Sequence, residues 1–236
     1  MQRPPELGLP ALALEASVRG GSLALWTSES AGSTATLTVQ RVLDSDQSHA
    51  RDLIPVLDEL LQEAGLDARQ LATVVVGTGP GSFTGLRVAI ATAQGLAHAT
   101  GAGLIGVPSI AAMALGSLAE GETACILVDA FGGAAYLAVY RREAEGLETL
   151  RAPEVHPLED LPDEVPAGER ILALPGGGFL DKLPEALLDR VEEARPPRAG
   201  ELLTLARSLQ DGDSAPCPSS VEPLYLRPFA ARPRRR

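Results

Sequence analysis

The sequence predicts an α/β protein with mixed sheets. Three features indicate this fold class: a β-branched apolar run at residues 71–76, a glycine-rich turn at 77–84 and an almost uncharged helical segment at 85–99. A buried strand followed by a turn and a helix is a basic unit of α/β folds. The 236 residues suffice for one large domain or two small ones, and 45% hydrophobic residues are ordinary for a globular protein.

The start of the chain is predicted to form strands. Residues 11–16 and 21–26 are two short apolar runs joined by a turn that contains Gly20, which is typical of a hairpin. Residues 35–42 alternate polar with mostly apolar side chains and are predicted to be a third strand.

A helix is predicted to follow these strands. From residue 53 to 64 the apolar side chains recur at helical spacing, and Gly65 is placed to end the helix. Ser48 is a candidate cap at its start. Pro55 lies within the pattern, where it either kinks the helix or marks its true first turn.

Strands and helices continue to alternate toward the C-terminus. The predicted elements are strand 104–107, helix 109–118, strands 124–129 and 134–140, strand 171–174, helices 179–191 and 199–209, and loop 211–223. The near-repetition of strand, hairpin and helix predicts two lobes, the second of which begins near Val107.

A glycine-rich turn between a strand and a helix can bind phosphate, because backbone amides at a helix N-terminus attract anions. Its spacing does not match the specific motifs. No Gly-Lys-Ser/Thr follows, and Gly77, Gly79 and Gly81 do not have the dinucleotide-binding register. The simpler interpretation is a structural turn, made by these glycines and Pro80, that needs positive φ and close packing.

The helix after this turn is apolar nearly all round, since Arg87 is its only formally charged residue. Such a helix should be buried on both sides. A stripe of small residues, Gly85, Ala89, Ala93 and Ala97, recurs every fourth position. This stripe would let another helix approach closely. The covering element is either the second lobe of this chain or another protein.

Catalytic and metal-binding signals are few. His49, His98 and His156 are scattered, and no H-x-x-x-H or C-x-x-C spacing occurs. The two cysteines, Cys125 and Cys217, do not form a disulfide framework. Two carboxylates at or near strand ends, Glu15 and Asp129, have positions suited to a metal or phosphate site, although isolated acids of this kind are more often solvated.

The net charge of −11 argues against broad binding to nucleic acid. The arginine-rich end, 232–236, is either a solvated tail or a weak contact for RNA or another polyanion. Neither an apolar leader nor an apolar run of about 18 residues is present, so a cytoplasmic protein that does not enter the membrane is expected.

The motifs resemble those of the TsaB (YeaZ) family. The matching strings are GTGPGSFTGLR at 77–87, AxGLA at 93–97, GVPS at 106–109, LALEAS at 12–17, residues 49–64, VDA at 128–130 with Tyr136 and Tyr140, and YLR at 225–227. The first string is highly specific, and together the strings span most of the chain.

The resemblance implies an ASKHA fold, the two-lobed fold of actin-like ATPases and sugar kinases. We expect an N-terminal lobe at 1–106, completed by the helix near 199–209, a smaller lobe at 107–227 and a disordered basic tail at 228–236. The family supports threonylcarbamoyladenosine formation at adenosine 37 of tRNA.

The resemblance also implies a role without catalysis or cofactor. Family members pair with the ATP- and metal-dependent enzyme TsaD, are joined by the ATPase TsaE, and can form homodimers through the same helices. Contact with tRNA is expected to be indirect or weak. The predicted partner-binding residues in this chain are Leu53, Val56, Leu57, Leu60, Gly85, Ala89, Ala93 and Ala97.

Departures from known patterns strengthen the non-catalytic interpretation. Ser109 and Met113 stand where TsaD relatives carry a metal-binding H-x-x-x-H. Glu15 replaces the usual aspartate and Phe131 replaces a basic residue, so Glu15 and Asp129 are interpreted as vestigial phosphate-site positions. The alternative is a residual ATP-binding enzyme or a metalloprotease-like relative, which Glu15, Asp129 and the glycine turn at 176–178 would support.

Overall fold

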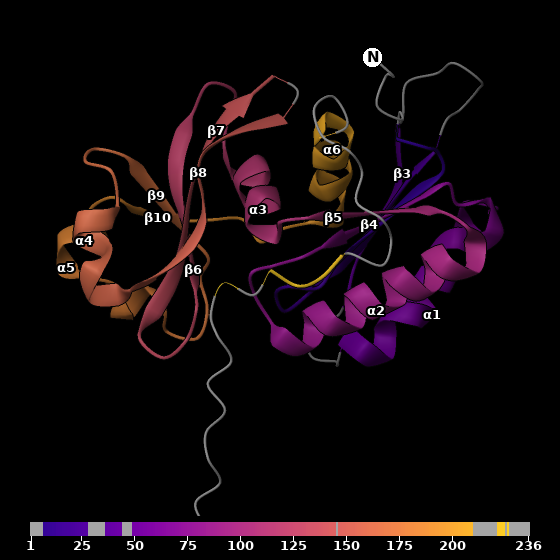
Figure 1. The fold of residues 1–236 in the computed structure, drawn as a ribbon, viewed down its shortest axis with the longest axis horizontal. Helices are drawn as coiled ribbons and strands as arrows, with labels where there is room; N and C mark the ends of the chain where they lie inside the picture. Colours follow the sequence, from indigo (N-terminus) through magenta and orange to yellow (C-terminus); the bar gives the residue numbers. More distant parts are fainter. Residues whose placement is uncertain are drawn as a thin grey trace, which may run out of the picture.

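The computed structural model describes residues 7–27, 36–43, 49–144, 146–209, 221–224 and 226, with the backbone alone at 36–38, 49–52 and 209. Two five-stranded sheets lie side by side, each with helices packed against it (Figure 1). Among the described residues, no helix is long and apolar enough to cross a membrane.

The first sheet, here called the N-terminal sheet, has the strand order β3-β2-β1-β4-β5. Its strands are β1 Ala11–Glu15, β2 Ser22–Thr27, β3 Thr36–Val42, β4 Thr73–Gly77 and β5 Gly103–Val107. β1 pairs antiparallel with β2 and parallel with β4, so the sheet is mixed. Every strand predicted in this part of the chain is present, with ends shifted by one or two residues.

The second sheet, here called the C-terminal sheet, repeats this topology with the order β8-β7-β6-β9-β10. Its strands are β6 Thr123–Asp129, β7 Ala134–Glu143, β8 Gly146–Pro157, β9 Arg170–Ala173 and β10 Val191–Glu193. β6 pairs antiparallel with β7 and parallel with β9, as β1 does with β2 and β4. This duplicated mixed sheet confirms the predicted two-lobed α/β fold of the ASKHA class.

Helices cover both faces of each sheet. The outer face of the N-terminal sheet carries α1 His49–Glu63 and α2 Phe83–Thr100, with the short 3₁₀ turn Ala68–Gln70 between them in the chain. Between the sheets lie α3 Ser109–Ser117 and α6 Ala199–Leu209 (Figure 1). Among the described elements, the far face of the C-terminal sheet carries α4 Leu161–Glu164, α5 Glu185–Leu188 and the 3₁₀ turns Leu158–Asp160 and Leu180–Lys182.

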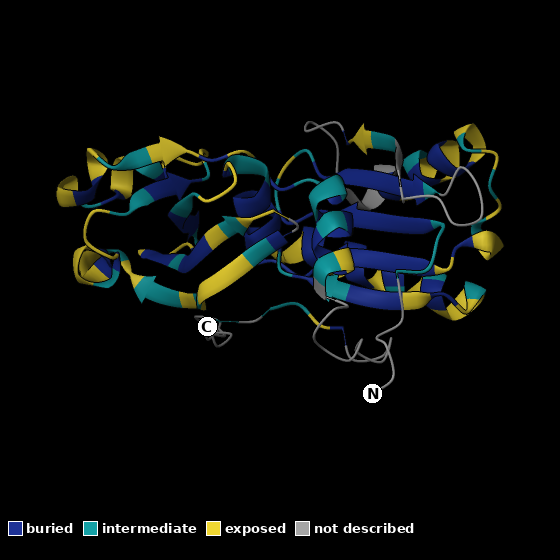
Figure 2. Cartoon of the chain, turned by 90° about the horizontal axis from the view of Figure 1, so that it is seen from above, coloured by how far each residue is buried: buried dark blue, intermediate teal, exposed yellow. Residues whose placement is uncertain are grey.

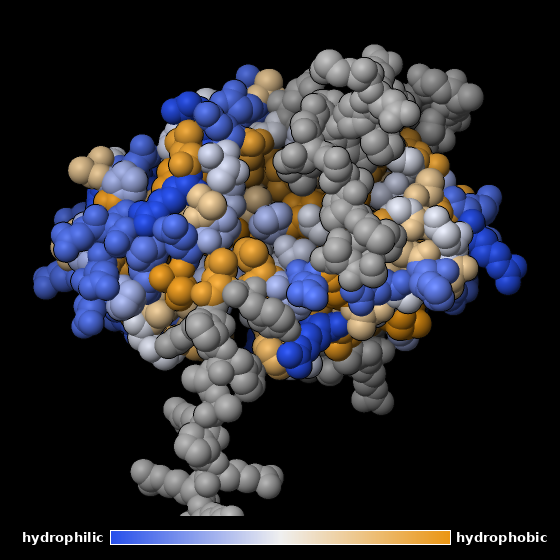
Figure 3. All heavy atoms as spheres, in the orientation of Figure 1, coloured by the Kyte–Doolittle hydropathy of each residue, from blue (hydrophilic) through white to orange (hydrophobic). Residues whose placement is uncertain are grey.

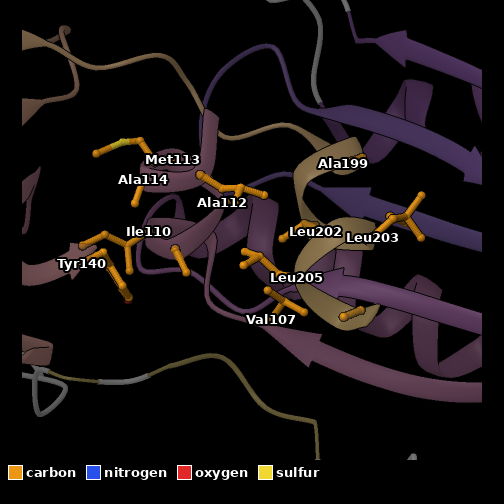
Figure 4. Close-up of a cluster of buried hydrophobic side chains, with 14 of the residues drawn as sticks. Val107, Ile110, Ala112, Met113, Ala114, Tyr140, Ala199, Leu202, Leu203 and Leu205 are labelled. Carbon is orange, nitrogen blue, oxygen red and sulfur yellow. The ribbon is translucent and has the colours of Figure 1, made fainter. Parts of the chain in front are cut away.

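The two inner helices are exchanged between the sheets. α3 directly follows the N-terminal sheet but packs on β6, β7 and β8, whereas α6 follows the C-terminal sheet and packs on β1, β2 and β4. Their side chains form one buried cluster, in which Leu202 and Leu205 of α6 lie near Val107 and Ala112 (Figure 4). This exchange ties the two halves of the chain through a shared apolar core.

The burial pattern differs between the halves. Three strands of the N-terminal sheet, β1, β2 and β4, are buried along nearly their whole length, while β8 at the edge of the C-terminal sheet has exposed stretches (Figure 2). No strand was predicted at β8, whose prolines and charges are typical of an edge strand that resists pairing with other chains.

Two helix predictions need correction. The predicted helix at 179–191 is instead a 3₁₀ turn, the four-residue α5 and strand β10. Leu183 is extended, with ψ of 145°, because the following Pro184 disfavours helical backbone at the residue before it. In α1, Pro55 is the seventh residue, so the first-turn alternative is wrong and the proline lies inside the helix.

Some predictions are not settled by the described residues. Several predicted features lie outside the described residues: the Ser48 cap, most of loop 211–223, Tyr225, Arg227 and the tail at 228–236. The lobe boundary at 106/107 stays a prediction.

Candidate functional site: the glycine turn and the outer helices

The turn between β4 and α2 is shaped by close packing. Gly79 has a φ of 95°, a left-handed conformation that glycine adopts without strain. A side chain on Gly81 would collide with the backbone carbonyl of Ser17, and one on Gly77 would collide with the Glu15 carboxyl. The turn therefore packs directly on the end of β1.

Hydrogen bonds fix where α2 begins. The Ser82 N–H donates to the Ser17 carbonyl at 2.6 Å, and the Ser82 hydroxyl accepts the Gly85 N–H at 3.2 Å as the helix cap. On the other side, the Leu224 N–H donates to the Thr78 carbonyl at 2.8 Å. These hydrogen bonds fix the first turn of α2 on the outer side of the sheet.

The small-residue stripe of α2 faces the chain's own core. Ala89 and Ala93 are 0% exposed, and they pack with Leu53 and Leu60 of α1 and with the strands. The predicted partner-binding residues that are buried in this way are Leu53, Leu57, Leu60, Gly85, Ala89, Ala93 and Ala97, while Val56 is half-buried.

The folded chain therefore leaves little of this predicted surface for a partner to contact, and its role in partner binding stays a prediction. The small residues let α2 lie close to its own sheet and to α1, so the cover comes neither from the second lobe nor from another protein. A signal in the sequence could have revealed this: two large apolar side chains, Leu86 and Ile90, flank Ala89 and Ala93 on the same side of the helix.

Among the described residues, the opposite side of both helices is exposed or partly exposed. We call this surface the outer helical face: Ile54, Pro55, Asp58, Glu59 and Gln62 of α1, and Thr84, Arg87, Val88, Ala91, Thr92, Gly95, Leu96, His98 and Ala99 of α2. Ile54 is 54% exposed, and the Arg87 guanidinium stacks over the Phe83 ring at 3.8 Å. Along α2 this face consists mostly of small or apolar side chains.

The far end of the C-terminal half has a different surface. Blue, hydrophilic atoms dominate where Figure 1 places α4 and α5, whereas paler and orange atoms are interspersed along α2 (Figure 3). The outer helical face is therefore the better candidate for a protein contact.

The two vestigial phosphate-site carboxylates have different surroundings. Glu15 is fully buried at the end of β1, and burial raises the pKa of its carboxyl. Asp129 accepts the Phe131 N–H at 2.7 Å and lies 3.8 Å from the Lys182 ammonium. Both carboxylates are thus held by this chain's own groups.

The described residues do not fit the metal centre of TsaD relatives. Ser109 and Met113, at the positions of the metal-binding histidines, are each 1% exposed, and the Ser109 hydroxyl accepts the Gly79 N–H. No group of three histidine, cysteine or acidic side chains suited to a metal ion occurs within the described part of the chain.

Comparison with known proteins agrees with this geometry. The family model described as TsaD, tRNA N6-adenosine threonylcarbamoyltransferase, matches residues 43–188. The tRNA threonylcarbamoyladenosine biosynthesis protein TsaB of Escherichia coli is 28% identical over 92% of this chain and 94% of its own length. An uncharacterized Mycobacterium tuberculosis protein is 34% identical over 82% of each chain.

A solved structure is similar to this chain over nearly its whole length. YeaZ from Pseudomonas aeruginosa superposes with a TM-score of 0.73 at 25% identity, over 92% of this chain and 99% of that one. The duplicated sheets and the closely packed glycine turn place the protein in the two-lobed ASKHA class. Within that class, the chain belongs to the TsaB (YeaZ) family.

Proposed function

We propose that this chain is a non-catalytic subunit that binds a TsaD-type threonylcarbamoyltransferase through the outer helical face. In this role it supports threonylcarbamoyladenosine formation at adenosine 37 of tRNA. The names of its relatives support the pathway: the E. coli and Haemophilus influenzae proteins are called tRNA threonylcarbamoyladenosine biosynthesis proteins.

Gly95 is the observation that carries the docking proposal. It lies inside α2 and is exposed, and apart from its chain neighbours and the helix's own backbone no atom lies within 4 Å of the place where a side chain would begin. Glycine in a helix interior costs about 1 kcal/mol relative to alanine. Nothing within the described chain requires it there, whereas a partner helix approaching α2 closely would require a small residue.

The surrounding residues are consistent with such an approach. Ala91 and Ala99 are also exposed and small, and Val88 and Leu96 add apolar area at the edges of the same face. Asp58 and Glu59 on the neighbouring α1 are exposed acids that would favour basic groups on the partner.

The non-catalytic part of the proposal is supported by chemistry. Neither serine nor methionine replaces imidazole as a ligand for a hard or borderline metal at ordinary affinity. The Glu15 carboxyl is 0% exposed. We further propose a cytoplasmic location, recruitment of TsaE by the assembled pair, weak or indirect contact with tRNA, and a homodimer that uses the same face.

The docking proposal is tested by titrating a TsaD-type partner against purified wild type, Ala91→Arg and Ala186→Arg in a calorimeter. Ala91 and Ala186 are both exposed helical alanines, but Ala186 lies on α5. Arginine at 91 should weaken binding roughly 100-fold or more, because it places bulk and charge at the centre of the face. Arginine at 186 should leave the affinity unchanged.

Equal binding by all three proteins would show that the docking surface is elsewhere. Two further measurements separate the remaining parts of the proposal. Sedimentation with and without the partner should show the homodimer giving way to the heterodimer, since one face cannot serve both. Calorimetry with ATP and Mg²⁺ on the isolated chain should show no binding, and tight binding would favour the residual-enzyme alternative.

A further inference from the structure

A short segment near the C-terminus packs on the N-terminal sheet, far from its place in the sequence. We call residues 221–224 the C-terminal strap. Val221 is 4% exposed and belongs to the buried cluster between that sheet and the two outer helices. Its carbonyl accepts a hydrogen bond from the Gln94 side-chain amide at 3.0 Å. The strap therefore lies against α2, where Figure 1 draws it in yellow.

The space for Val221 comes from a glycine of the edge strand β5. A Cβ atom at Gly106 would lie 2.8 Å from Thr78 Cγ2 and 3.0 Å from Val221 Cγ1. Gly106 does not have a positive φ, so its backbone conformation does not require glycine. The absence of a side chain at 106 instead leaves a notch that Val221 fills.

The other end of the strap is bonded to the glycine turn. The Leu224 N–H donates to the Thr78 carbonyl at 2.8 Å, and the Thr78 N–H donates to the Val107 carbonyl at 2.9 Å. Thr78 is thus held by β5 on one side and by the strap on the other. Since the turn leads directly into α2, the strap contacts both this helix and the turn that positions it.

The contacts that hold the strap are few within the described part of the chain. They comprise the buried Val221 side chain and the hydrogen bonds with Gln94 and Thr78. Glu222 is exposed, and Pro223 is partly exposed. These favourable terms are comparable to the conformational entropy lost when four residues become ordered. The strap is therefore able to open while the sheet stays folded.

We propose that the C-terminal strap is a conformational device that controls the outer helical face. When docked, it fixes the glycine turn and α2 in one arrangement, and when it opens, both lose order. Gln94 transmits this effect to the face, because Ala91 lies three residues before it and His98 four residues after it on the same helix. The effect on the chain stands by itself, whereas its effect on partner affinity rests on the proposed function.

Thermodynamic linkage makes the second effect reciprocal. If a TsaD-type partner binds the face better when the strap is docked, the partner must favour the docked strap by the same factor. Coupling of this kind usually amounts to about 5–150-fold in affinity. We expect about tenfold, since the strap contacts one side of α2 and leaves the exposed residues of the face in place.

The device is tested first in the isolated chain by amide hydrogen exchange of three variants. Val221→Asp places a charge in the notch, and Leu224→Pro removes the N–H that bonds Thr78 while keeping the valine. Glu222→Ala changes an exposed side chain of the same segment and is the control. The first two should speed exchange of the Thr78 amide by about tenfold at an unchanged far-ultraviolet circular dichroism spectrum, and the control should not.

Exchange rates equal to wild type in both strap variants would overturn the proposal. If Val221→Asp fails to fold, Leu224→Pro decides the outcome, because it leaves the apolar contact intact. Global unfolding of both variants would also contradict the proposal, since the strap would then be an inseparable part of the fold rather than a segment that opens.

The effect on binding is tested by calorimetric titration of a TsaD-type partner. Val221→Asp and Leu224→Pro should each bind about tenfold more weakly than wild type, and Glu222→Ala should bind equally well. In wild type, the partner should slow exchange of the Leu224 amide by the same factor. Unchanged affinity in the strap variants, or an equal loss in Glu222→Ala, would overturn the control of binding by the strap.

These results separate the strap from the proposed function. If wild type itself does not bind the partner, the proposed function fails, and the exchange rates of the isolated chain still decide whether the strap orders the glycine turn. If wild type binds and the strap variants bind equally well, the docking proposal stands and the control by the strap fails.

Discussion

The two sheets of this protein share one strand order but carry different outer layers. The N-terminal sheet is covered by helices of 15 and 18 residues, the C-terminal sheet by two helices of four residues each. At 1.5 Å per residue, α2 is about 27 Å long and each short helix about 6 Å. An interface needs about 800 Å² from each partner, so only the longer layer offers a continuous helical surface. Topology alone therefore does not determine which half can dock a partner.

The same contrast exists within α2. Its inner side meets the sheet through Ala89 and Ala93, while its outer side carries Ala91 and Gly95 in the open. Small residues thus occur on both sides, for different reasons. The inner ones allow close packing within the chain, and we attribute the outer ones to close packing between chains.

Arginine substitutions on the two sides of α2 should differ most in their effect on stability. Ala93→Arg forces a charge into a site that is 0% exposed, which costs several kcal/mol of a total stability of about 5–15 kcal/mol. Ala91→Arg places the same group in solvent and should leave the melting temperature almost unchanged. Circular dichroism melts measure both, and a folded Ala93→Arg protein with native stability would contradict the assignment of the inner side.

Truncation of the largest buried side chain of the C-terminal half should be the next largest effect. Phe179 is 1% exposed in the core beneath α4 and α5. Phe179→Ala should cost about 3–5 kcal/mol in denaturant unfolding. If the outer helical face docks the partner, protein that remains folded should bind it with wild-type affinity. Loss of binding without unfolding would place the docking surface in the C-terminal half.

Replacement of Gly95 should separate stability from binding. Gly95→Ala adds a methyl group to open space in a helix interior, so it should stabilise the isolated chain by about 0.5–1 kcal/mol. Gly95→Leu should also keep the chain folded but weaken the partner complex, because its bulk keeps the helices apart. A Leu variant that binds as tightly as wild type would refute the close approach at this position.

The smallest effect is expected from the ion pair between β9 and β10. The Arg170 guanidinium bonds both carboxylate oxygens of Glu192, at 2.9 and 2.8 Å, and this lowers the pKa of Glu192. The lowered pKa means that the stabilisation is present above pH 4.5 and is lost as the pH falls through the folded-state pKa. Arg170→Met should lower the melting temperature slightly at pH 7 and low salt, and not at low pH.

A matched variant completes that measurement. Glu192→Gln should show a smaller loss than Arg170→Met, because Arg170 also lies 3.1 Å from the Glu122 carboxylate and keeps that pair in this variant. Since both groups are exposed, added salt should weaken the wild-type advantage. A loss that persists at high salt would point to packing by the arginine side chain rather than to charge.

The sequence specified the strands well, because Val74, Val75 and Val76 leave little choice except a buried strand. It failed where neighbouring residues override a local pattern. Pro184 interrupts apolar residues that otherwise have helical spacing. In β8 the charges and prolines disrupt the alternating pattern by which a strand is predicted. For the candidate site, the sequence did not reveal which side of α2 the chain buries, since alanine and glycine give almost no directional signal without Leu86 and Ile90 as markers.

Hydrogen exchange of the chain with and without a TsaD-type partner tests the central claim most directly. The account predicts slower exchange in the presence of the partner for the amides of α1 and α2, and no change in α4 and α5. Slower exchange confined to α4, α5 or the edge strand β8, with α1 and α2 unaffected, would contradict it.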